Sequence, residues 1–170
     1  RQVEKYEVYI LYGIRPLTPD NVEDLFDKRV NLIKIDSFMG AIGTVVNFKA
    51  YRDLRRWYKA IKPDIVHLHS SASGFVGRWA LPCGKLPVFY TPHGYSFLMK
   101  DGAKFKRFLF WLIEYFSAKR SAITVACSEG EYKEALELSG DSTYVNNGIN
   151  IRELEKYVRP IDKIRYPIRI

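Results

Sequence analysis

Short apolar runs alternate with longer amphipathic stretches along this chain of 170 residues. Runs rich in β-branched and aromatic residues predict strands at 6–12, 30–35, 65–68, 87–90, 122–127 and 143–145. Helical periodicity predicts helices at 45–61, 70–82, 104–119 and 128–139, with a short helical turn at 22–26. Buried strands that alternate with helices are typical of parallel sheets. The pattern therefore predicts a doubly wound, mostly parallel α/β sheet with helices on both faces.

The apolar run 65–68 is the centre of this arrangement. Pro63 and Asp64 break the chain before it, and small polar residues at 70–74 follow it. We expect this strand to be buried on both faces and the polar turn to begin a helix. Ligands of open α/β sheets bind beyond the carboxyl ends of the strands, which predicts one edge of a ligand site at 69–73. The polar loop at 91–96 follows the next strand and is expected at the same edge.

The charge of the chain favours anionic partners. The net charge is +8 and the isoelectric point is about 9.4, values that suit phosphorylated ligands or acidic lipids. Cys83 and Cys127 each lie among apolar residues, which fits a reducing compartment better than a disulfide framework. The charged start resembles no signal peptide, and the longest apolar run, 108–113, is too short to span a bilayer. We therefore expect a cytoplasmic protein, with peripheral attachment to the inner face of the membrane as a further possibility.

The candidate chemistry excludes several classes of site. His67 and His69 would share one face of a strand, but the only other histidine is His93 and no carboxylate cluster is near. No metal site is predicted, and histidines hydrogen-bonded at a strand end are the favoured interpretation. No dinucleotide fingerprint or P-loop follows a strand, so no cofactor is expected. No nucleic-acid partner is expected either, because the basic residues are spread over helices and the tail.

Four short motifs occur in the order expected of one known domain: 63–70 (PDIVHLHS), 91–94 (TPHG), 126–129 (ACSE) and 147–150 (NGIN). They resemble the N-terminal, acceptor-binding domain of family 4 glycosyltransferases, which are retaining enzymes of the GT-B fold. The resemblance implies two Rossmann-like domains that face each other across a cleft, with the nucleotide-sugar held mainly by the C-terminal one. It implies an acceptor-binding domain at 1–150, and an interdomain linker with the start of a truncated second domain at 151–170.

The chain departs from the family pattern in three ways. By comparison with the family, we expect that the family's usual first strand and glycine-rich loop would precede this sequence, and that the paired-glutamate motif of the donor site would follow it. Asn150 also replaces the aspartate that usually ends the linker motif, a mild change because asparagine keeps the turn-forming chemistry. We therefore expect the chain alone to be inactive.

The resemblance assigns roles to individual residues. It implies that His93 is the catalytic cleft histidine, that Ser128 and Glu129 lie beneath the cleft, and that Asn147 and Gly148 form the hinge. The edge argument adds residues of the two polar loops to the acceptor and donor cleft: His69, Ser70, Ser71, Gly74, Thr91, Gly94 and Tyr95. Simpler structural roles stay open. His93 could cap a loop, Ser128 and Glu129 could only cap a helix whose capping box Glu131 closes, and Asn147-Gly148 could be a surface turn.

The predicted function is transfer of a sugar from a nucleotide-sugar donor to a glycan or lipid-linked acceptor, in cell-surface polysaccharide synthesis. Two alternatives stay open: a nucleotide-sugar epimerase of the same fold, and a non-catalytic binding module for anionic glycans or lipids. A convincing set of acid/base carboxylates, which an epimerase would need, is not visible in the sequence.

A possible anionic membrane surface is a further expected partner. The helix at 45–61 sets a basic stripe with Arg52 and Arg56 beside Trp57, as interfacial helices do. The helix at 104–119 carries apolar residues around nearly its whole circumference, and its aromatic residues could add exposed area: Phe105, Phe108, Phe110, Trp111 and Tyr115. The alternative is that both helices simply pack on the sheet.

Overall fold

Every strand pair in the computed structural model is parallel. The structure describes residues 2–39, 45–99, 103–138 and 141–148. β1 (Tyr9–Tyr12) pairs with β2 (Asn31–Lys34), and a second sheet has the order β3 (Val66–His69), β4 (Val88–Thr91), β5 (Ile123–Ala126), β6 (Ser142–Tyr144). The predicted parallel α/β architecture is confirmed, and each predicted strand is present. β1, β2 and β5 are shorter than predicted, whereas β3, β4 and β6 have the predicted length and are shifted by one residue. The split into two separate sheets was not predicted.

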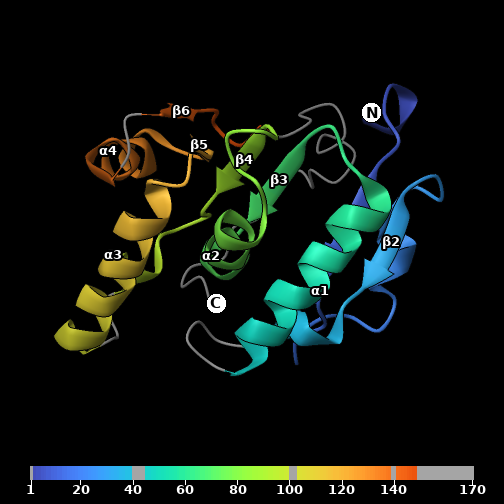
Figure 1. Ribbon diagram of the computed structural model, residues 1–170, viewed down its shortest axis with the longest axis horizontal. Coiled ribbons are helices and arrows are strands. Elements are labelled where there is room, and N and C mark those ends of the chain that lie inside the picture. Colours follow the sequence, from blue (N-terminus) through green and yellow to red (C-terminus); the bar gives the residue numbers. More distant parts are fainter. Residues whose placement is uncertain (1, 40–44, 100–102, 139–140, 149–170) are drawn as a thin grey trace, which may run out of the picture.

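The helices form one continuous layer. They are α1 (Val45–Ile61), α2 (Ser71–Ala80), α3 (Lys104–Ala118) and α4 (Glu129–Leu138), and Figure 1 shows their arrangement. Each contacts the next in chain order, and right-handed crossovers between successive parallel strands place α2, α3 and α4 on the same face of the larger sheet. Helices were also predicted on the second face, but all four α-helices of the described residues belong to this one layer.

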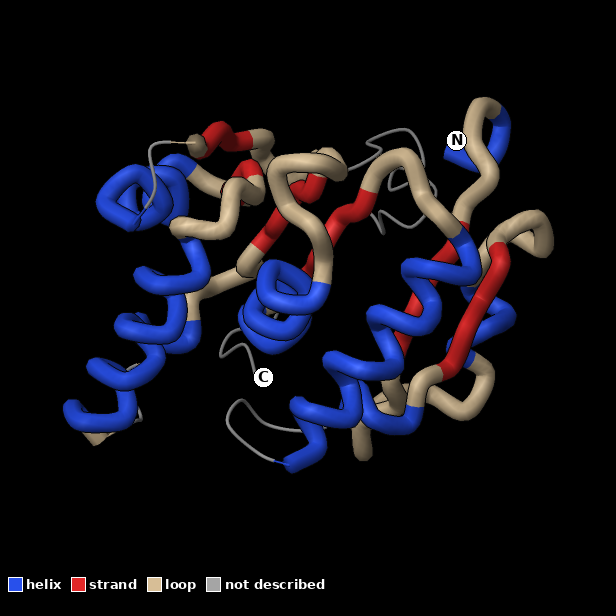
Figure 2. The backbone as a smooth tube through the Cα atoms, viewed as in Figure 1, coloured by secondary structure: helices blue, strands red, loops and turns tan. Residues whose placement is uncertain are grey.

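Four short 3-10 helices complete the described elements: η1 (Gln2–Glu4), η2 (Val22–Leu25), η3 (Asp36–Met39) and η4 (Ser96–Leu98). The β1–β2 pair lies to one side of the larger sheet, with α1 crossing in front of β1 (Figure 2). α1 contacts both η3 and α2. It therefore joins the smaller sheet to the rest of the fold.

α1 has the predicted bounds and buries only part of its apolar surface. Ala50 is buried, and Leu54 and Tyr58 pack against the core, whereas Phe48 is exposed. The helix ends where Lys62 takes a positive φ of 51° and Pro63 follows, because proline disfavours helical geometry in the residue before it.

α2 packs directly on side chains of the larger sheet because two of its contact positions are glycines. A Cβ at Gly74 would clash with the Tyr90 ring, and one at Gly77 would clash with the Leu68 side chain. Tyr90 and Leu68 belong to the main core cluster, so the glycines let the helix backbone reach that core directly.

β3 is buried on one face only, which corrects the prediction of two buried faces. Leu68 is buried beneath α2, while His67 and His69 on the other face are exposed and Ile65 before the strand is 57% exposed. The α-helical layer covers only the Leu68 face of this strand. The rings of His67 and His69 lie 4.1 Å apart, as expected for residues two apart in a strand.

α3 buries two of its polar residues and leaves several of its large apolar residues exposed. Glu114 and Ser117 are its buried residues, whereas Phe105, Phe108, Leu109, Trp111 and Phe116 are exposed. The buried Glu114 pairs with the buried Arg78 of α2 at 2.6 Å and accepts a hydrogen bond of 3.0 Å from the Tyr90 hydroxyl. The Arg78 guanidinium lies 4.2 Å from the centre of the Tyr90 ring. This polar network anchors α3 to α2 and β4.

Candidate functional site

The carboxyl ends of β3, β4, β5 and β6 bring four polar segments to one edge of the larger sheet. The Ser70 amide donates to the Thr91 carbonyl at 2.9 Å, and the Val145 amide donates to the Ala126 carbonyl at 2.9 Å. The segments that follow these strands are therefore held side by side. They include His69, His93 and Cys127, and we call this surface the strand-end edge.

Three histidines and one cysteine are linked along the strand-end edge. His69 Nδ1 lies 3.0 Å from His93 Nε2, and Cys127 Sγ lies 3.4 Å from His93 Nδ1. His67 Nε2 lies 2.8 Å from the Thr91 hydroxyl. Both ring nitrogens of His93 therefore have partners within the chain, and its ring is held between β3 and β5.

Partial desolvation shifts several pKa values in this cluster. Although His67 and His69 still reach solvent, desolvation, with His69 and His93 beside it, lowers the pKa of His67 to about 4, and desolvation together with His93 lowers the pKa of His69. Burial and the neighbouring Glu131 raise the pKa of the Cys127 thiol, so it stays protonated at neutral pH. A protonated thiol can donate to His93 Nδ1.

Glu131 ties together the two loops on either side of His93. Its carboxylate accepts hydrogen bonds of 2.6 Å from the backbone amides of Gly94 and Cys127, and the side chain is buried. The Ser128 hydroxyl accepts from the Glu131 amide at 3.2 Å, which is one half of the predicted capping box. The other half is not formed, because the carboxylate binds the two loops instead. Glu131 was not predicted as a site residue, since its position three residues after Ser128 suggested only helix capping.

Two residues at this edge have strained backbone. Ser70 has φ 78° and ψ 155°, and His93 has φ 52°. Such conformations in residues other than glycine cost on the order of 1–3 kcal/mol and are maintained only where surrounding contacts enforce them. The Ser70 amide is held by Thr91, and the Ser73 hydroxyl donates to the carbonyls of both His69 and Ser70. The adjoining Gly94 also has a positive φ of 95°, which glycine adopts freely.

Several predicted cleft residues are buried beneath the edge and do not face solvent. They are Ser71, Gly74, Thr91 and Tyr95. Gly74 packs on the Tyr90 ring, Thr91 holds His67, and Tyr95 stacks on Phe97 in the core. The sequence pattern placed them near a strand end but did not give the direction of their side chains. They pack beneath the loops that follow β3 and β4.

The remaining predicted residues lie at the surface. Ser128, Glu129, Asn147 and Gly148 are exposed, and Ser70 is half-buried. Glu129 makes an exposed ion pair of 2.9 Å with Lys133. A side-chain hydrogen bond from Asn147 lowers the pKa of the Cys127 thiol, against the larger effect of burial. Asn147, predicted as a hinge residue, is thus in contact with the same cluster as His93.

Arg52 and Arg56 are exposed on α1, and Trp57 beside them is half-buried. No described helix combines the length and apolar character needed to cross a bilayer. Within the described part of the chain, no three histidine, cysteine, aspartate or glutamate side chains are grouped as a metal site would require.

The sequence model of the family described as Glycosyltransferase Family 4 matches residues 2–153. The chain is 32% identical over 143 residues to the Escherichia coli UDP-Gal:alpha-D-GlcNAc-diphosphoundecaprenol alpha-1,3-galactosyltransferase, covering 82% of this chain and 36% of that protein. It is 43% identical over 82 residues to an uncharacterized 41.2 kDa protein in the cps region of Klebsiella pneumoniae, which is 45% of this chain and 22% of the relative. It is 29% identical over 126 residues to the putative glycosyltransferase EpsD of Bacillus subtilis, which is 70% of this chain and 32% of EpsD.

A solved structure shares the fold. The S. aureus MnaA-UDP co-structure superposes with a TM-score of 0.50 at 16% sequence identity, covering 94% of this chain and 48% of that one. The chain thus spans between 22% and 36% of the length of these curated relatives, and about half of the solved structure.

Proposed function

Because this chain belongs to glycosyltransferase family 4, we propose that it forms the acceptor-binding half of an enzyme that transfers a sugar from a nucleotide-sugar to a glycan or lipid-linked acceptor. The proposed setting is cell-surface polysaccharide synthesis, with retention of configuration at the sugar. Support comes from the E. coli relative, whose name specifies a UDP-sugar donor and a diphosphoundecaprenol acceptor and which matches most of this chain. The parallel α/β fold is the architecture such a half would have.

The observation that carries this proposal is the placement of His93. The ring is exposed at the strand-end edge and is oriented by His69 and Cys127, while Gly94 beside it leaves the backbone open. In sugar transfer, charge develops on the leaving diphosphate and at the anomeric carbon. A hydrogen-bond donor that is already oriented toward this charge stabilises the transition state more than one that must first reorganise. The role proposed for His93 is to bind a sugar hydroxyl or to stabilise this charge through Nε2. The substrate would replace His69 as the partner of that nitrogen, while Cys127 holds Nδ1.

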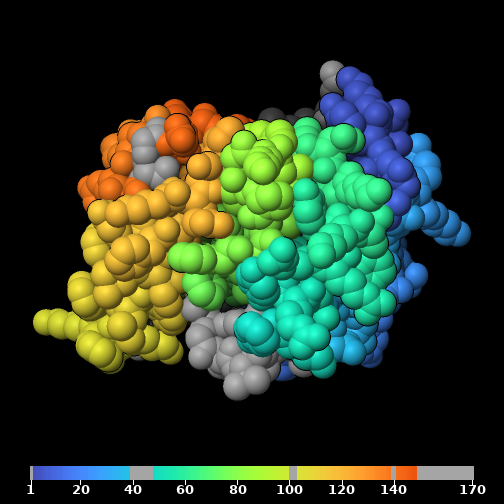
Figure 3. All heavy atoms as spheres, in the orientation of Figure 1, coloured from blue at the N-terminus to red at the C-terminus, as the bar shows by residue number. Residues whose placement is uncertain are grey.

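A lipid-linked acceptor would require the protein to lie against a membrane, and α3 offers a suitable surface. Phe105 is 72% exposed and Phe116 is 54% exposed. Lys104 and Lys106 are also exposed, and the only carboxylate of α3, Glu114, is buried against Arg78. The amino-terminal half of the helix extends from one corner of the molecule (Figure 3). An exposed aromatic face flanked by lysines and free of carboxylates fits an anionic bilayer surface.

The proposed membrane contact lies mainly on α3, with Arg52 and Arg56 of α1 as additional cations. Trp57 is half-buried and offers less of its ring than the aromatic residues of α3. A basic residue near an acidic leaflet contributes about 1 kcal/mol, so several together give reversible, salt-sensitive attachment.

Transfer by the full-length protein tests the proposal. A panel of labelled nucleotide-sugars is incubated with lipid-diphosphate-linked sugar acceptors, and product is followed by chromatography. We expect acceptor-dependent transfer by the full-length protein and none by the 170-residue chain alone, because both halves of the cleft must position the reactants. Conversion of the nucleotide-sugar without acceptor would favour an epimerase. Acceptor binding by the full-length protein without consumption of any donor would favour a binding module.

Cosedimentation with lipid vesicles tests the membrane surface. Binding to acidic vesicles should fall with rising salt, with Arg52→Glu plus Arg56→Glu, and most strongly with Phe105→Ser plus Phe108→Ser. Equal binding to neutral vesicles, or no binding to acidic ones, contradicts the proposed membrane contact.

A further inference from the structure

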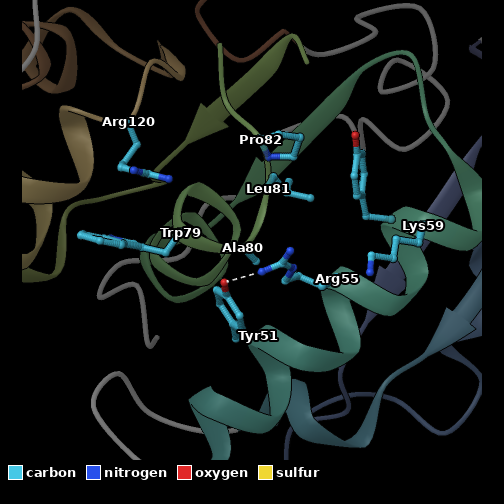
Figure 4. Close-up of a pocket in the computed structure, with 9 residues that line it drawn as sticks. Tyr51, Arg55, Lys59, Trp79, Ala80, Leu81, Pro82 and Arg120 are labelled. Atoms are coloured by element: carbon cyan, nitrogen blue, oxygen red, sulfur yellow. Dashed lines mark hydrogen bonds between the residues drawn. The ribbon is translucent and has the colours of Figure 1, made fainter. Parts of the chain in front are cut away.

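A basic pocket lies where the ends of α1, α2 and α3 meet. Its volume is about 300 Å³, at the lower end of the range for small-molecule sites. Its lining includes three cations, Arg55, Lys59 and Arg120, and three aromatic side chains, Tyr51, Tyr58 and Trp79. In Figure 4, Arg55 and Arg120 approach the end of α2 from opposite sides. We call this set of six residues the basic pocket.

The positive charge of the basic pocket is not neutralised within the described residues. No carboxylate lines it, and none of the ion pairs recorded in the described ranges includes Arg55, Lys59 or Arg120. Three like charges held around one hollow repel one another, which is unfavourable unless an anion is present or solvent screens them.

The two arginines are partly oriented by the protein and keep free donors. Arg55 Nη1 donates to the Tyr51 hydroxyl at 3.0 Å, and Arg120 Nε donates to the Arg78 carbonyl at 3.3 Å. The Arg120 guanidinium also lies 5.2 Å from the centre of the Trp79 ring. A guanidinium has five N–H donors, so each arginine retains donors that point toward the hollow (Figure 4).

A simpler role for these cations is to neutralise the carboxyl ends of the three helices that meet here. Each helix end carries only about half a negative charge, whereas the basic pocket holds three full positive charges. The helix ends therefore leave a net positive site, and capping explains one arginine contact, that of Arg120 with the Arg78 carbonyl.

The basic pocket is separate from the strand-end edge. The helix ends that form it precede β3, β4 and β5 in the chain, so they lie at the amino ends of those strands. His69, His93 and Cys127 lie at the carboxyl ends. Since all these strands are parallel, the two sites lie at opposite ends of the strands of one sheet.

We propose that the basic pocket binds a phosphate or diphosphate group, outside the transfer cleft. Arginine donors match phosphate oxygens in paired hydrogen bonds, and aromatic walls suit an apolar or ring portion next to the phosphate. The phosphate could belong to the headgroup of an acidic lipid or to a soluble phosphorylated molecule. This inference does not depend on the sugar that the protein transfers.

The test is titration of the full-length protein with inorganic diphosphate, followed by isothermal calorimetry at low salt. Arg55→Gln plus Arg120→Gln should weaken binding at least tenfold. The matched control is Arg15→Gln plus Lys28→Gln, which removes the same charge from exposed positions near the smaller sheet. The control should change the dissociation constant less than twofold.

A second variant guards against loss of folding. Lys59→Gln removes one charge of the basic pocket without breaking any recorded hydrogen bond of a described residue, and it should weaken binding severalfold. Vesicles that contain an acidic phospholipid separate the two sources. A loss in the pocket variants for vesicles alone identifies a lipid headgroup, and a loss for diphosphate alone identifies a soluble ligand. An equal loss in the control variant, or no saturable binding of either probe, overturns the proposal. Transfer activity is measured in a separate assay, so a protein that shows no sugar transfer can still show phosphate binding at the basic pocket.

Discussion

Replacing Glu131 by glutamine tests whether one buried carboxylate holds the strand-end edge together. The carboxylate accepts two backbone hydrogen bonds of 2.6 Å and is only 9% exposed. Hydrogen bonds to a charged group contribute about 1.5–3 kcal/mol each. Glutamine keeps one oxygen acceptor but sets its NH₂ group against the second amide. We therefore expect Glu131→Gln to lower the free energy of unfolding by about 1.5–3 kcal/mol, and Glu131→Ala by roughly twice that.

The same substitution should lower activity, because Gly94 and Cys127 hold the segments on either side of His93. A displacement of about 1 Å at a reacting group can reduce the rate about 100-fold. We expect Glu131→Gln to reduce kcat of the full-length protein at least about tenfold, equivalent to about 1.4 kcal/mol. The matched control is Glu129→Gln two residues earlier, since Glu129 makes only an exposed ion pair with Lys133, typically worth less than about 1 kcal/mol.

Urea unfolding at pH 7, followed by circular dichroism, measures the stability of each variant, and initial rates of transfer measure kcat. The reasoning is refuted if the two glutamine variants shift the unfolding midpoint equally. A destabilised Glu131→Gln protein with normal kcat would refute the functional part alone.

Three further predictions concern the same core and edge. His93→Ala should lower kcat of the full-length protein at least about tenfold with little change in melting temperature, and near-normal kcat would return His93 to a structural role. Arg78→Leu should cost about 3–5 kcal/mol because it leaves Glu114 buried without its partner. The double variant with Glu114→Leu should recover part of that loss in urea unfolding, and additive losses would contradict the coupling. The folded pKa of His67 is about 4, below the value of about 6.5 for an unfolded chain, so stability should be full above pH 6.5 and fall as pH drops through 4. NMR titration of the ring and thermal melts between these pH values check this, and a constant melting temperature across the window would exclude it.

Local sequence patterns predicted the elements well because their causes are local. The bounds of α1 follow from helical periodicity and from Lys62-Pro63 at its end. The strand-end edge followed from the parallel order, which brings His69 and His93 together although 24 residues separate them. Family resemblance and topology selected the same loops at this edge.

What could not be predicted depends on contacts between distant segments. Glu114 can be buried because it pairs with Arg78, which is 36 residues earlier in the chain. Nothing in the periodicity of α3 indicates that this glutamate faces inward. Gly74 and Tyr95 were assigned to the cleft from their nearness to strand ends, yet both are packed in the interior. The role of Glu131 likewise depends on the amide of Gly94, 37 residues earlier.

The division into two hydrogen-bonded sheets has a consequence for how the protein opens. The main core cluster draws its buried residues from the larger sheet and the segments around it, whereas every residue of β1 and β2 is half-buried or exposed. The β1–β2 pair is joined to that core through the contacts of α1 with η3 and α2. Cooperative units with few buried apolar contacts open at lower free energy than the whole domain. Amide hydrogen exchange in β1 and β2 should therefore proceed by a local opening, while the amides of β4 and β5 exchange only when the domain unfolds.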